Sequence, residues 1–394
     1  MKTKMFYQTN IFQCFQKTIF IIIIKILCLG TSYSQGDEYL IKEFTYHNGS
    51  VFSVAFSPDG NYLMSGSEDK QLIILNLKNL EVEKKFSNNY YSPFCIEVTD
   101  VNNIYFGSGP DIKLIDLNNN KLAVFGGNTT QIWSLDYGPK NHKIVAGSFD
   151  YKVRVWDCAT QKITMILEGH KKGVLAAAFS PDEKYIVTGS MDKTVKIWNA
   201  ETGEMIKSLD RHSDKIYSVC FHPSGKYFAS CSDDKTVKLW DAESGDVLQT
   251  YFGHDYGVLD IKFTPDGNHL LSASADGTIR LWQIKSGNMV YTFTGHKGAV
   301  NSIAINKDGS LLASGGIDKK VILWKLDKKI FVEYAYANEF NAEKNKSNLF
   351  IPKQKDETKE DFNLRKIKAK SLEDQIVEVY YKKYIEELGK QTFK

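Results

Sequence analysis

The chain has 394 residues, of which 42% are hydrophobic and 25% are charged, a composition that is ordinary for a soluble globular protein. Its formal charge of +3 comes from both signs spread along the sequence, so the net charge gives no reason to expect a nucleic-acid or membrane partner. The six cysteines lack CxxC spacing, so we expect small buried hydrophobes rather than metal ligands or disulfides.

Residues 1–34 have the order of a secretory signal peptide. Lysines precede the apolar run 18–30, whose 13 residues are too few to cross a bilayer, and small residues follow it, with Ser32 and Ser34 in a small-x-small arrangement. This order predicts cleavage after Ser34 and export to the periplasm or cell envelope. Lys25 interrupts the apolar run, so the alternative is a cytoplasmic protein that retains this segment.

A repeated pattern of short strands fills most of the chain after the leader. In its clearest copy, His170 opens the unit, apolar strand segments follow, Asp192 occupies a tight turn and Trp198 closes the third strand. His lies 28 residues and Asp six residues before the Trp, and the pattern returns every 42 residues with ends at Trp240, Trp282 and Trp324. A fixed period of this length predicts stacked supersecondary units that share one core.

Three less regular copies precede these four. They end at Leu75, Ile115 and Trp156, so that Leu75 stands where the first copy should have Trp, and Asn128 stands where the third copy should have His. The second copy keeps neither the Gly-His start nor the Asp of the turn. The chain therefore contains seven units, and we expect these three to be more loosely packed than the others.

Gly-His starts and Trp-Asp ends at this period resemble WD40 repeats, and the resemblance covers residues 39–327. It implies an all-β fold, a seven-bladed β-propeller with four-stranded blades. The last unit ends after Trp324-Lys325 without a fourth strand, whereas residues 39–45 look like one. We predict that strand 39–45 closes the ring by pairing with the last blade, so that one domain spans residues 35–327 and has no free edge.

The resemblance also implies a structural role for the repeated polar residues. In each regular blade a His, an Asp, a hydroxyl and a Trp form a buried hydrogen-bonded set that fixes the packing. In the fourth unit the hydroxyl belongs to Thr188 or Ser190. The expected structural residues are His170, Asp192, Trp198, His212, Asp234, Trp240, His254, Asp276, Trp282, His296, Asp318 and Trp324.

In this family, the face that carries the Asp turns and the starts of the first strands commonly binds peptides. Three positions in each blade point to this face: the residue before the turn Asp, the residue after the first apolar residue of the first strand, and the residue two before that one. The collected set is aromatic and aliphatic with Lys215 and Asp233 as its charges, as expected of an interaction hot spot. The alternative is that these side chains only pack together at the mouth of the channel. The predicted partner-binding residues are Phe52, Trp133, Phe149, Leu175, Met191, Lys215, Tyr217, Asp233 and Leu259.

The period stops after residue 327. Residues 328–361 are predicted to form a linker, and apolar residues at helical spacing predict a helical tail over residues 362–390. Ser371 could cap a second helix within the tail. The tail either docks on the side of the propeller or mediates association with a partner or a second copy.

The sequence contains no nucleophile elbow, phosphate-binding loop, HExxH or paired-carboxylate motif. We therefore expect no catalytic residues, no cofactor, no metal and no small-molecule substrate. The predicted function is a non-catalytic, monomeric scaffold for a protein or peptide partner in the bacterial envelope, or alternatively an intracellular signalling or assembly scaffold. An enzyme that used the central funnel would need acids and histidines facing the channel, whereas the sequence assigns its histidines to the blade sets.

Overall fold

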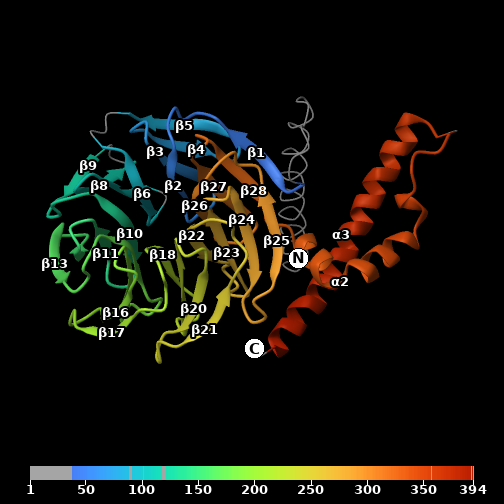
Figure 1. Cartoon of the computed structure of the whole chain (residues 1–394). Helices are drawn as coiled ribbons and strands as arrows, with labels where there is room; N and C mark the ends of the chain where they lie inside the picture. The colour runs from blue at the N-terminus through green and yellow to red at the C-terminus, as the bar shows by residue number, and fades with distance from the viewer. Residues whose placement is uncertain are drawn as a thin grey trace, which may run out of the picture.

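A computed structural model describes residues 38–87, 91–100, 102–117, 121–355, 357–391 and 393. It shows seven four-stranded sheets arranged in a ring, with a helical arm beside them (Figure 1). The predicted seven-bladed propeller is confirmed. The predicted signal peptide lies outside the described residues and stays a prediction.

Each blade is a meander of four antiparallel strands, and neighbouring blades contact each other through their first strands. Blades 1 to 7 are numbered in chain order. The first strands are β2 (Val51–Phe56), β6 (Pro93–Val98), β10 (Ile132–Gly138), β14 (Val174–Phe179), β18 (Ile216–Phe221), β22 (Val258–Phe263) and β26 (Val300–Ile305). The second strands are β3 (Tyr62–Ser67), β7 (Asn103–Ser108), β11 (Lys143–Ser148), β15 (Tyr185–Ser190), β19 (Tyr227–Ser232), β23 (His269–Ser274) and β27 (Leu311–Gly316).

The outer half of each blade follows the same order. The third strands are β4 (Leu72–Asn76), β8 (Asp111–Asp116), β12 (Val153–Asp157), β16 (Val195–Asn199), β20 (Val237–Asp241), β24 (Thr278–Gln283) and β28 (Val321–Lys325). The fourth strands are β5 (Glu81–Phe86), β9 (Lys121–Phe125), β13 (Lys162–Leu167), β17 (Met205–Leu209), β21 (Val247–Tyr251), β25 (Met289–Thr294) and β1 (Leu40–Phe44). The second strands are almost wholly buried between blades, whereas a fourth strand such as β13 alternates between exposed and half-buried residues.

The first strand of the chain closes the ring, as predicted. β1 pairs antiparallel with β28, which places Leu40 beside Trp324 and Phe44 beside Val321. Blade 7 therefore takes three strands from the end of the repeat region and one from its beginning. Pairing the two ends in this way leaves no blade with an open edge where its fourth strand should be.

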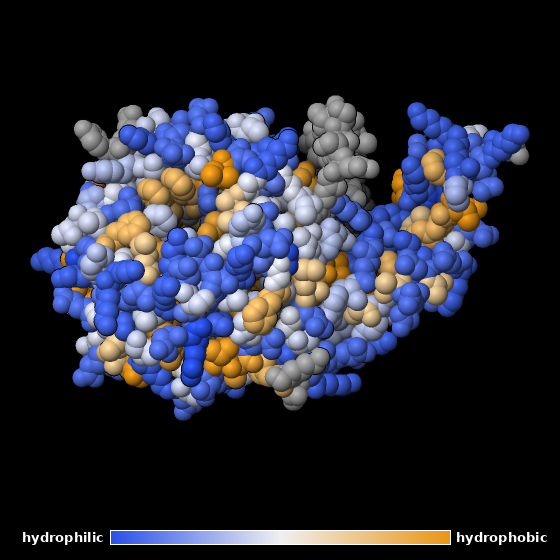
Figure 2. Space-filling view, viewed as in Figure 1, coloured by the Kyte–Doolittle hydropathy of each residue, from blue (hydrophilic) through white to orange (hydrophobic). Residues whose placement is uncertain are grey.

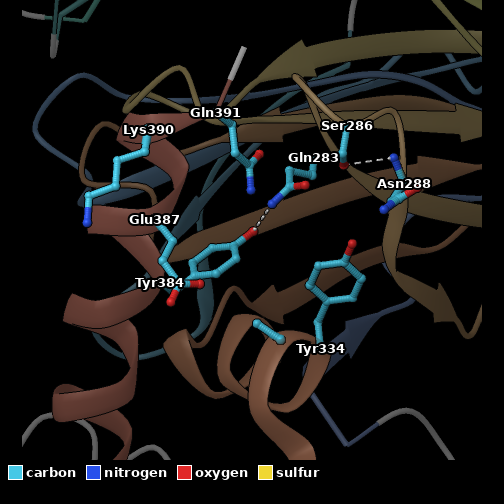
Figure 3. A pocket seen from close by; sticks show the side chains of 9 residues that line it. Gln283, Ser286, Asn288, Tyr334, Tyr384, Glu387, Lys390 and Gln391 are labelled. Carbon is cyan, nitrogen blue, oxygen red and sulfur yellow. Dashed lines mark hydrogen bonds between the residues drawn. The ribbon is translucent and has the colours of Figure 1, made fainter. Parts of the chain in front are cut away.

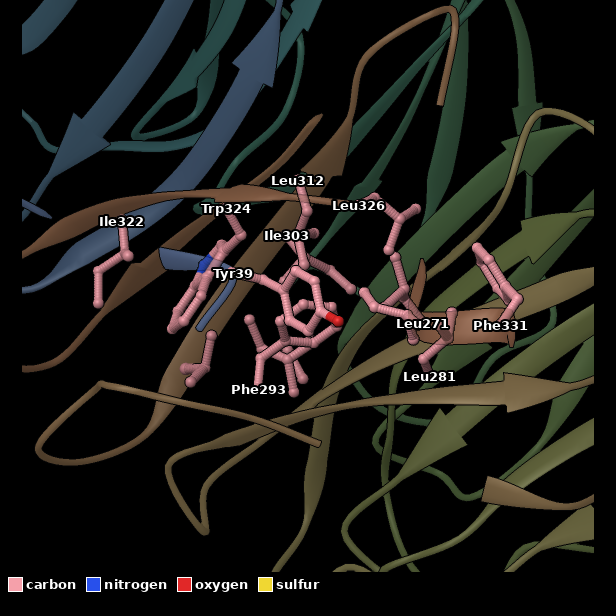
Figure 4. Packing of buried hydrophobic residues seen from close by; sticks show 14 of the residues in the cluster. Tyr39, Leu271, Leu281, Phe293, Ile303, Leu312, Ile322, Trp324, Leu326 and Phe331 are labelled. Atoms are coloured by element: carbon pink, nitrogen blue, oxygen red, sulfur yellow. The ribbon is translucent and has the colours of Figure 1, made fainter. Parts of the chain in front are cut away.

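The predicted linker over residues 328–361 is wrong in its first half, because helix α2 (Lys328–Asn345) begins directly after blade 7. The Asp327 side chain caps the helix by accepting a hydrogen bond from the Lys329 N–H. Phe331 packs into a cluster of apolar residues from blades 6 and 7 (Figure 4), while Val332 and Phe340 pack against the last helix. Because apolar side chains are buried on two sides of it, the segment is helical although its composition is typical of a linker.

A short 3-10 turn η1 (Asn348–Phe350) leads to helix α3 (Lys359–Lys390), which confirms the predicted helical tail. Thr358 caps this helix, and the helix continues through Ser371, so no second helix begins there. Tyr384 and Leu388 join the same cluster as Phe331, and Lys285 Nζ bonds to the carbonyl oxygens of Leu388 and Gln391 at 3.2 and 2.9 Å. A cation at the C-terminal carbonyls suits the helix dipole. One end of the arm is thus docked on the ring, and the other end projects away from it (Figure 1).

Apolar side chains also reach solvent on the arm, where Leu364, Ile367 and Val379 are 53%, 67% and 66% exposed. Figure 2 shows orange groups among blue ones both on the arm and on the visible face of the ring. Among the described residues, no helix combines the length and the hydropathy needed to span a membrane.

Candidate partner-binding face

The repeated polar residues of blade 4 form one connected set. His170 Nδ1 lies 2.9 Å from Asp192 Oδ2, and His170 Nε2 lies 2.8 Å from Thr188 Oγ1. The indole N–H of Trp198 donates to the same Thr188 Oγ1 at 2.9 Å. The hydroxyl of the set is therefore that of Thr188, not that of Ser190.

Electrostatics in this set favour a neutral imidazole and an ionised carboxylate. Burial lowers the pKa of His170 below its ordinary value despite the neighbouring Asp192. Burial would raise the pKa of Asp192, but hydrogen bonds from His170, Thr194 and the Lys171 N–H outweigh it and hold this pKa well below its usual range. A neutral imidazole that donates from Nδ1 to the carboxylate can accept the Thr188 hydroxyl at Nε2, so every member has a partner.

Blades 5, 6 and 7 repeat this arrangement with a serine as the hydroxyl. All nine hydrogen-bond distances lie between 2.7 and 2.8 Å. The three sets are His212, Ser230, Asp234 and Trp240; His254, Ser272, Asp276 and Trp282; and His296, Ser314, Asp318 and Trp324. Because each set is satisfied within its own blade, these residues brace the ring and are not available for chemistry.

The less regular blades keep part of this network. In blade 1, His47 bonds to Asp69 and Ser65 at 3.0 and 2.8 Å, and Leu75 fills the place of the indole. In blade 3, Arg154 stands in for the missing histidine and donates to Asn128 Oδ1 at 2.8 Å and Asp150 Oδ1 at 3.0 Å. The turn Asp of blade 3 is thus not left without a partner, and the substitution at position 128 does not open the blade. The landmarks of the repeat do not predict that Arg154 takes the place of the histidine as the partner of Asp150.

A β-bulge lies near the start of the first strand in all seven blades. The register of each first strand shifts around its second residue, for example between Val51 and Ser53 in blade 1. A bulge leaves one residue outside the ladder and redirects its side chain. The bulge residues are Phe52, Phe94, Trp133, Leu175, Tyr217, Leu259 and Asn301. The bulge explains why the predicted partner-binding residue near the start of each first strand does not follow the alternation of side chains between the two faces of the strand.

Three of the bulge residues and a turn residue form a continuous row of rings, which we call the aromatic arc (Phe52, Phe94, Trp133 and Phe149). Phe52 and Phe94 are stacked with ring centroids 4.4 Å apart, Phe94 lies 5.1 Å from Trp133, and Trp133 lies 5.1 Å from Phe149. All four side chains are half-buried. The arc spans blades 1 to 3 and joins three of the predicted residues.

Sequence reasoning missed Phe94, although a signal for it exists. It lies 42 residues after Phe52, which is the repeat period, but blade 2 lacks the Gly-His and Asp landmarks that set the alignment. Three exposed tyrosines were also missed: Tyr91, Tyr151 and Tyr256 are 49%, 52% and 62% exposed in the loops and turns beside the bulges. Tyr151 and Tyr256 each lie within two residues of a landmark of the repeat, whereas Tyr91 belongs to blade 2, which has lost its landmarks.

The other predicted residues are a polar cluster on blade 5, two half-buried apolar residues, and one residue that is buried. Lys215 Nζ lies 5.2 Å from the centre of the Tyr217 ring and 3.3 Å from Asp233, so these three form one cluster on blade 5. Met191 and Leu259 are half-buried and stand apart from this cluster in blades 4 and 6.

Leu175 corrects the prediction, because it is only 3% exposed and cannot meet a partner. The side chains of Phe149 and Met191 approach the backbone at Gly173, two residues earlier, where an added Cβ would meet Phe149 Cδ1 at 2.5 Å. These larger side chains cover the start of β14.

Charged side chains from different blades meet near the axis of the ring. Glu97 on β6 and Lys262 on β22 interact electrostatically although blades 2 and 6 are not neighbours. Burial, followed by the charge of Asp136 on β10, raises the pKa of Glu97 to about 8. Burial raises the pKa of Asp136 to about 6, even though the Phe179 N–H donates to its Oδ2 at 2.6 Å. Asp260 lies 3.7 Å from Lys262 Nζ, and its charge raises the pKa of that lysine.

The axial acids are therefore compensated by a lysine and by the backbone, and the imidazoles of blades 1 and 4–7 stay within their own sets. The acid and histidine cluster that a funnel enzyme would need is not assembled by the part of the chain that the structure describes. That part also holds no group of three or more His, Cys, Asp or Glu arranged around a common metal position.

Six segments of the chain match the family described as "WD domain, G-beta repeat": residues 38–76, 119–157, 161–199, 203–241, 245–283 and 287–325. Together these segments make up more than half of the chain. Blade 2 is the one blade whose own repeat is not matched, in agreement with its missing landmarks.

Curated relatives align with parts of the chain. It is 30% identical over 152 residues to "Periodic tryptophan protein 2 homolog" of Dictyostelium discoideum, which covers 37% of this chain and 16% of that protein. It is 28% identical over 143 residues to "Transcription initiation factor TFIID subunit 5" of Caenorhabditis elegans, covering 34% and 21%. It is 29% identical over 121 residues to "WD repeat-containing protein 82" of Drosophila melanogaster, covering 29% and 38%. The alignments thus span well under half of each relative.

Proposed function

We propose that this chain, which belongs to the WD40-repeat family, is a non-catalytic scaffold that holds a protein or peptide partner against the aromatic arc. The observation that carries the proposal is the unbroken contact of four half-buried rings across three blades. Residues that served only to fill the core would be buried between blades, as Leu175 is.

The arc has the physical properties of a binding hot spot. Its rings are fixed by bulges and by contact with each other, so little side-chain entropy is lost when a partner covers them. Each ring keeps an accessible part that an apolar side chain of a partner can cover, and aromatic residues dominate the binding energy of most protein interfaces. Tyr91 and Tyr151 offer hydroxyl groups at the border of the arc, where a polar rim is expected.

The charges near the axis refine the expected partner. Because its pKa is raised to about 8, Glu97 is largely protonated at neutral pH, and the excess of acid near the axis comes from Asp136 and Asp260 beside the one lysine, Lys262. The partner segment that fits this face best carries an aromatic or aliphatic anchor with a basic residue close to it.

We propose an intracellular setting, the second of the two that the sequence left open. The relatives reported above support it, because one of them is named as a transcription initiation factor subunit and none of the three is named as an exported protein. N-terminal sequencing of the mature protein tests this point: a chain that keeps residues 1–34 agrees with the proposal, and a start near Gln35 would overturn it in favour of export.

The partner site is tested with peptides selected on the full chain from a displayed random library. We expect Phe94→Ala and Trp133→Ala each to weaken the binding of selected peptides by about 2 kcal/mol or more. The matched control is Tyr185→Ala, which removes a 38% exposed ring at the opposite end of blade 4. If the two arc variants lower the melting midpoint strongly while peptide affinity is unchanged, the arc is only a packing feature.

A further inference from the structure

A cavity of about 530 Å³ lies where the arm meets blade 6 (Figure 3). Its walls come from three elements: the turn between β24 and β25 carries Ser286 and Asn288, α2 carries Tyr334, and α3 carries Tyr384. The volume is within the range of small-molecule sites, which is roughly 300–1,000 Å³. The sequence predicts no small-molecule substrate because it contains no catalytic or phosphate-binding motif, and a cavity formed between the arm and the ring leaves no such motif in the sequence.

One wall of the cavity is held rigidly. Gln283 is 4% exposed, and its Nε2 donates to the Tyr384 hydroxyl at 3.2 Å. His269 Nε2 lies 2.7 Å from the same hydroxyl. Burial lowers the pKa of His269 to about 4, so this imidazole is neutral at neutral pH. Tyr384 is therefore fixed from two sides before any ligand arrives, which reduces the entropy that binding would cost.

The opposite wall carries polar groups that have no protein partner. Among the described residues, neither the Tyr334 hydroxyl nor the Asn288 side-chain amide makes a hydrogen bond. Figure 3 shows the Tyr334 hydroxyl directed toward the turn that carries Ser286 and Asn288. A phenol and a primary amide can each donate and accept, which matches a ligand whose own groups do both.

The charges around the cavity argue against an ionic ligand. Glu387 accepts a hydrogen bond from the Tyr336 hydroxyl at 2.5 Å and is thereby engaged within the arm. Figure 3 shows the Lys390 side chain directed away from Gln283 and Tyr334. Lys285 Nζ is engaged by the carbonyl oxygens of Leu388 and Gln391 at the C-terminal end of α3, so it is not free to pair with an anion.

We infer that this cavity binds a neutral polyhydroxylated ligand, a mono- or disaccharide, between blade 6 and the arm. Hydroxyl groups of a sugar suit the Asn288 amide and the Tyr334 phenol, and the apolar face of a pyranose ring suits the half-buried ring of Tyr334. The ring of Tyr384 is 2% exposed and stacked against His269 and Phe331, so it offers the cavity only its hydroxyl edge. Because such a ligand touches both the ring and the arm, its binding stabilises the docked arm. The inference is independent of the partner site on the aromatic arc.

The test uses the full chain with three probes, glucose, N-acetylglucosamine and maltose, followed by saturation-transfer NMR and calorimetry. At least one probe is expected to bind with a millimolar or tighter dissociation constant. Asn288→Ala and Tyr334→Phe are each expected to weaken that probe about fivefold to tenfold, because each removes one hydrogen bond to the ligand. Hydrogen exchange in the docked half of α3 should become slower when the probe is present.

Asp246→Ala is the matched control, since Asp246 holds the same turn position in blade 5, 42 residues before Asn288. It should leave binding unchanged, and all three variants should melt as the wild type does. The inference is overturned if none of the three sugars binds at millimolar concentration, if Asp246→Ala weakens binding as much as Asn288→Ala does, or if glucose 6-phosphate binds more tightly than glucose.

Discussion

The hydroxyl at the centre of each blade set should contribute more to the free energy of unfolding where a tryptophan also donates a hydrogen bond to it. Ser230 in blade 5 bonds to His212 Nε2 and accepts the Trp240 indole N–H, both at 2.8 Å. Ser65 in blade 1 bonds to His47 Nε2 at 2.8 Å, but Leu75 replaces the tryptophan there. Ser230 and Ser65 are 0% and 1% exposed, so water cannot replace either hydroxyl.

Replacing these serines by alanine removes the same atom from two equivalent places. Ser230→Ala leaves two buried polar groups without partners, and each costs about 1–3 kcal/mol, which gives a loss of about 2–6 kcal/mol. Ser65→Ala leaves one such group and should cost about 1–3 kcal/mol. The cavity left behind is equal in the two variants, so the difference between them measures the indole bond.

Urea unfolding of the full chain, followed by circular dichroism, provides the measurement. Ser230→Ala should lower the free energy of unfolding obtained from the urea titration by more than Ser65→Ala does. In a thermal melt of a domain of this size, about 1 kcal/mol corresponds to a shift of roughly 2–4 °C in the midpoint. Ser230→Ala made in a Trp240→Phe background should cost about as much as Ser65→Ala. Equal losses in the two single variants would refute the reasoning, because the tryptophan would then contribute no bond.

Three further changes test other parts of the structure. Deletion of residues 38–44 removes β1 and leaves β28 as an open edge, so we expect a larger drop in the urea midpoint than for Ser230→Ala, together with association in size-exclusion chromatography; a monomer of unchanged midpoint would contradict ring closure by this strand. The pKa of Glu97 is raised to about 8 in the folded chain and is about 4.3 in the unfolded chain. Its contribution to the free energy of unfolding is therefore complete below pH ~4 and is lost as the pH rises through 8, by at most about 5 kcal/mol. Glu97→Gln should flatten this loss in urea titrations from pH 5 to 9, and an unchanged slope would show that another group titrates. The pKa of His269 is lowered from about 6.5 to about 4 in the folded chain. Its contribution to the free energy of unfolding is therefore present above pH ~6.5 and is lost as the pH falls toward 4, by about 3 kcal/mol. Hydrogen exchange in the docked half of α3 should become faster as the pH falls over this range, and His269→Asn should remove this effect. If exchange becomes equally faster in both proteins, a group other than His269 causes it.

The repeat period made most of the fold predictable. A constant distance from His to Trp fixes the strands of each blade, and a missing fourth strand at Trp324 together with a surplus strand before His47 implies closure. The same spacing placed the residues of the aromatic arc wherever the landmarks survive. Phe94 escaped because blade 2 has lost those landmarks, although its side chain still occupies the bulge.

Features that depend on contacts between distant segments were not predictable from the period. Helix α2 was missed because residues 337–361 are rich in Asn, Lys and Glu, which is typical of a linker, although Val332, Tyr336 and Phe340 stand four residues apart. Phe331 faces the ring and Val332 faces α3. The electrostatic influence of Lys262 on Glu97 acts between blades 2 and 6, and a repeat pattern does not indicate which blades carry charge. The cavity beside Tyr334 exists only after the arm has docked.

The central claim is that the aromatic arc holds the partner, and a photo-crosslinking experiment tests it most directly. A photoreactive amino acid is placed at Tyr151, which is 52% exposed two residues after Phe149, or at Tyr185 at the far end of blade 4. We expect a crosslinked partner from position 151 that disappears when Trp133→Ala is added, and none from position 185. A crosslink from position 151 that survives Trp133→Ala, or an equal yield from position 185, would contradict it.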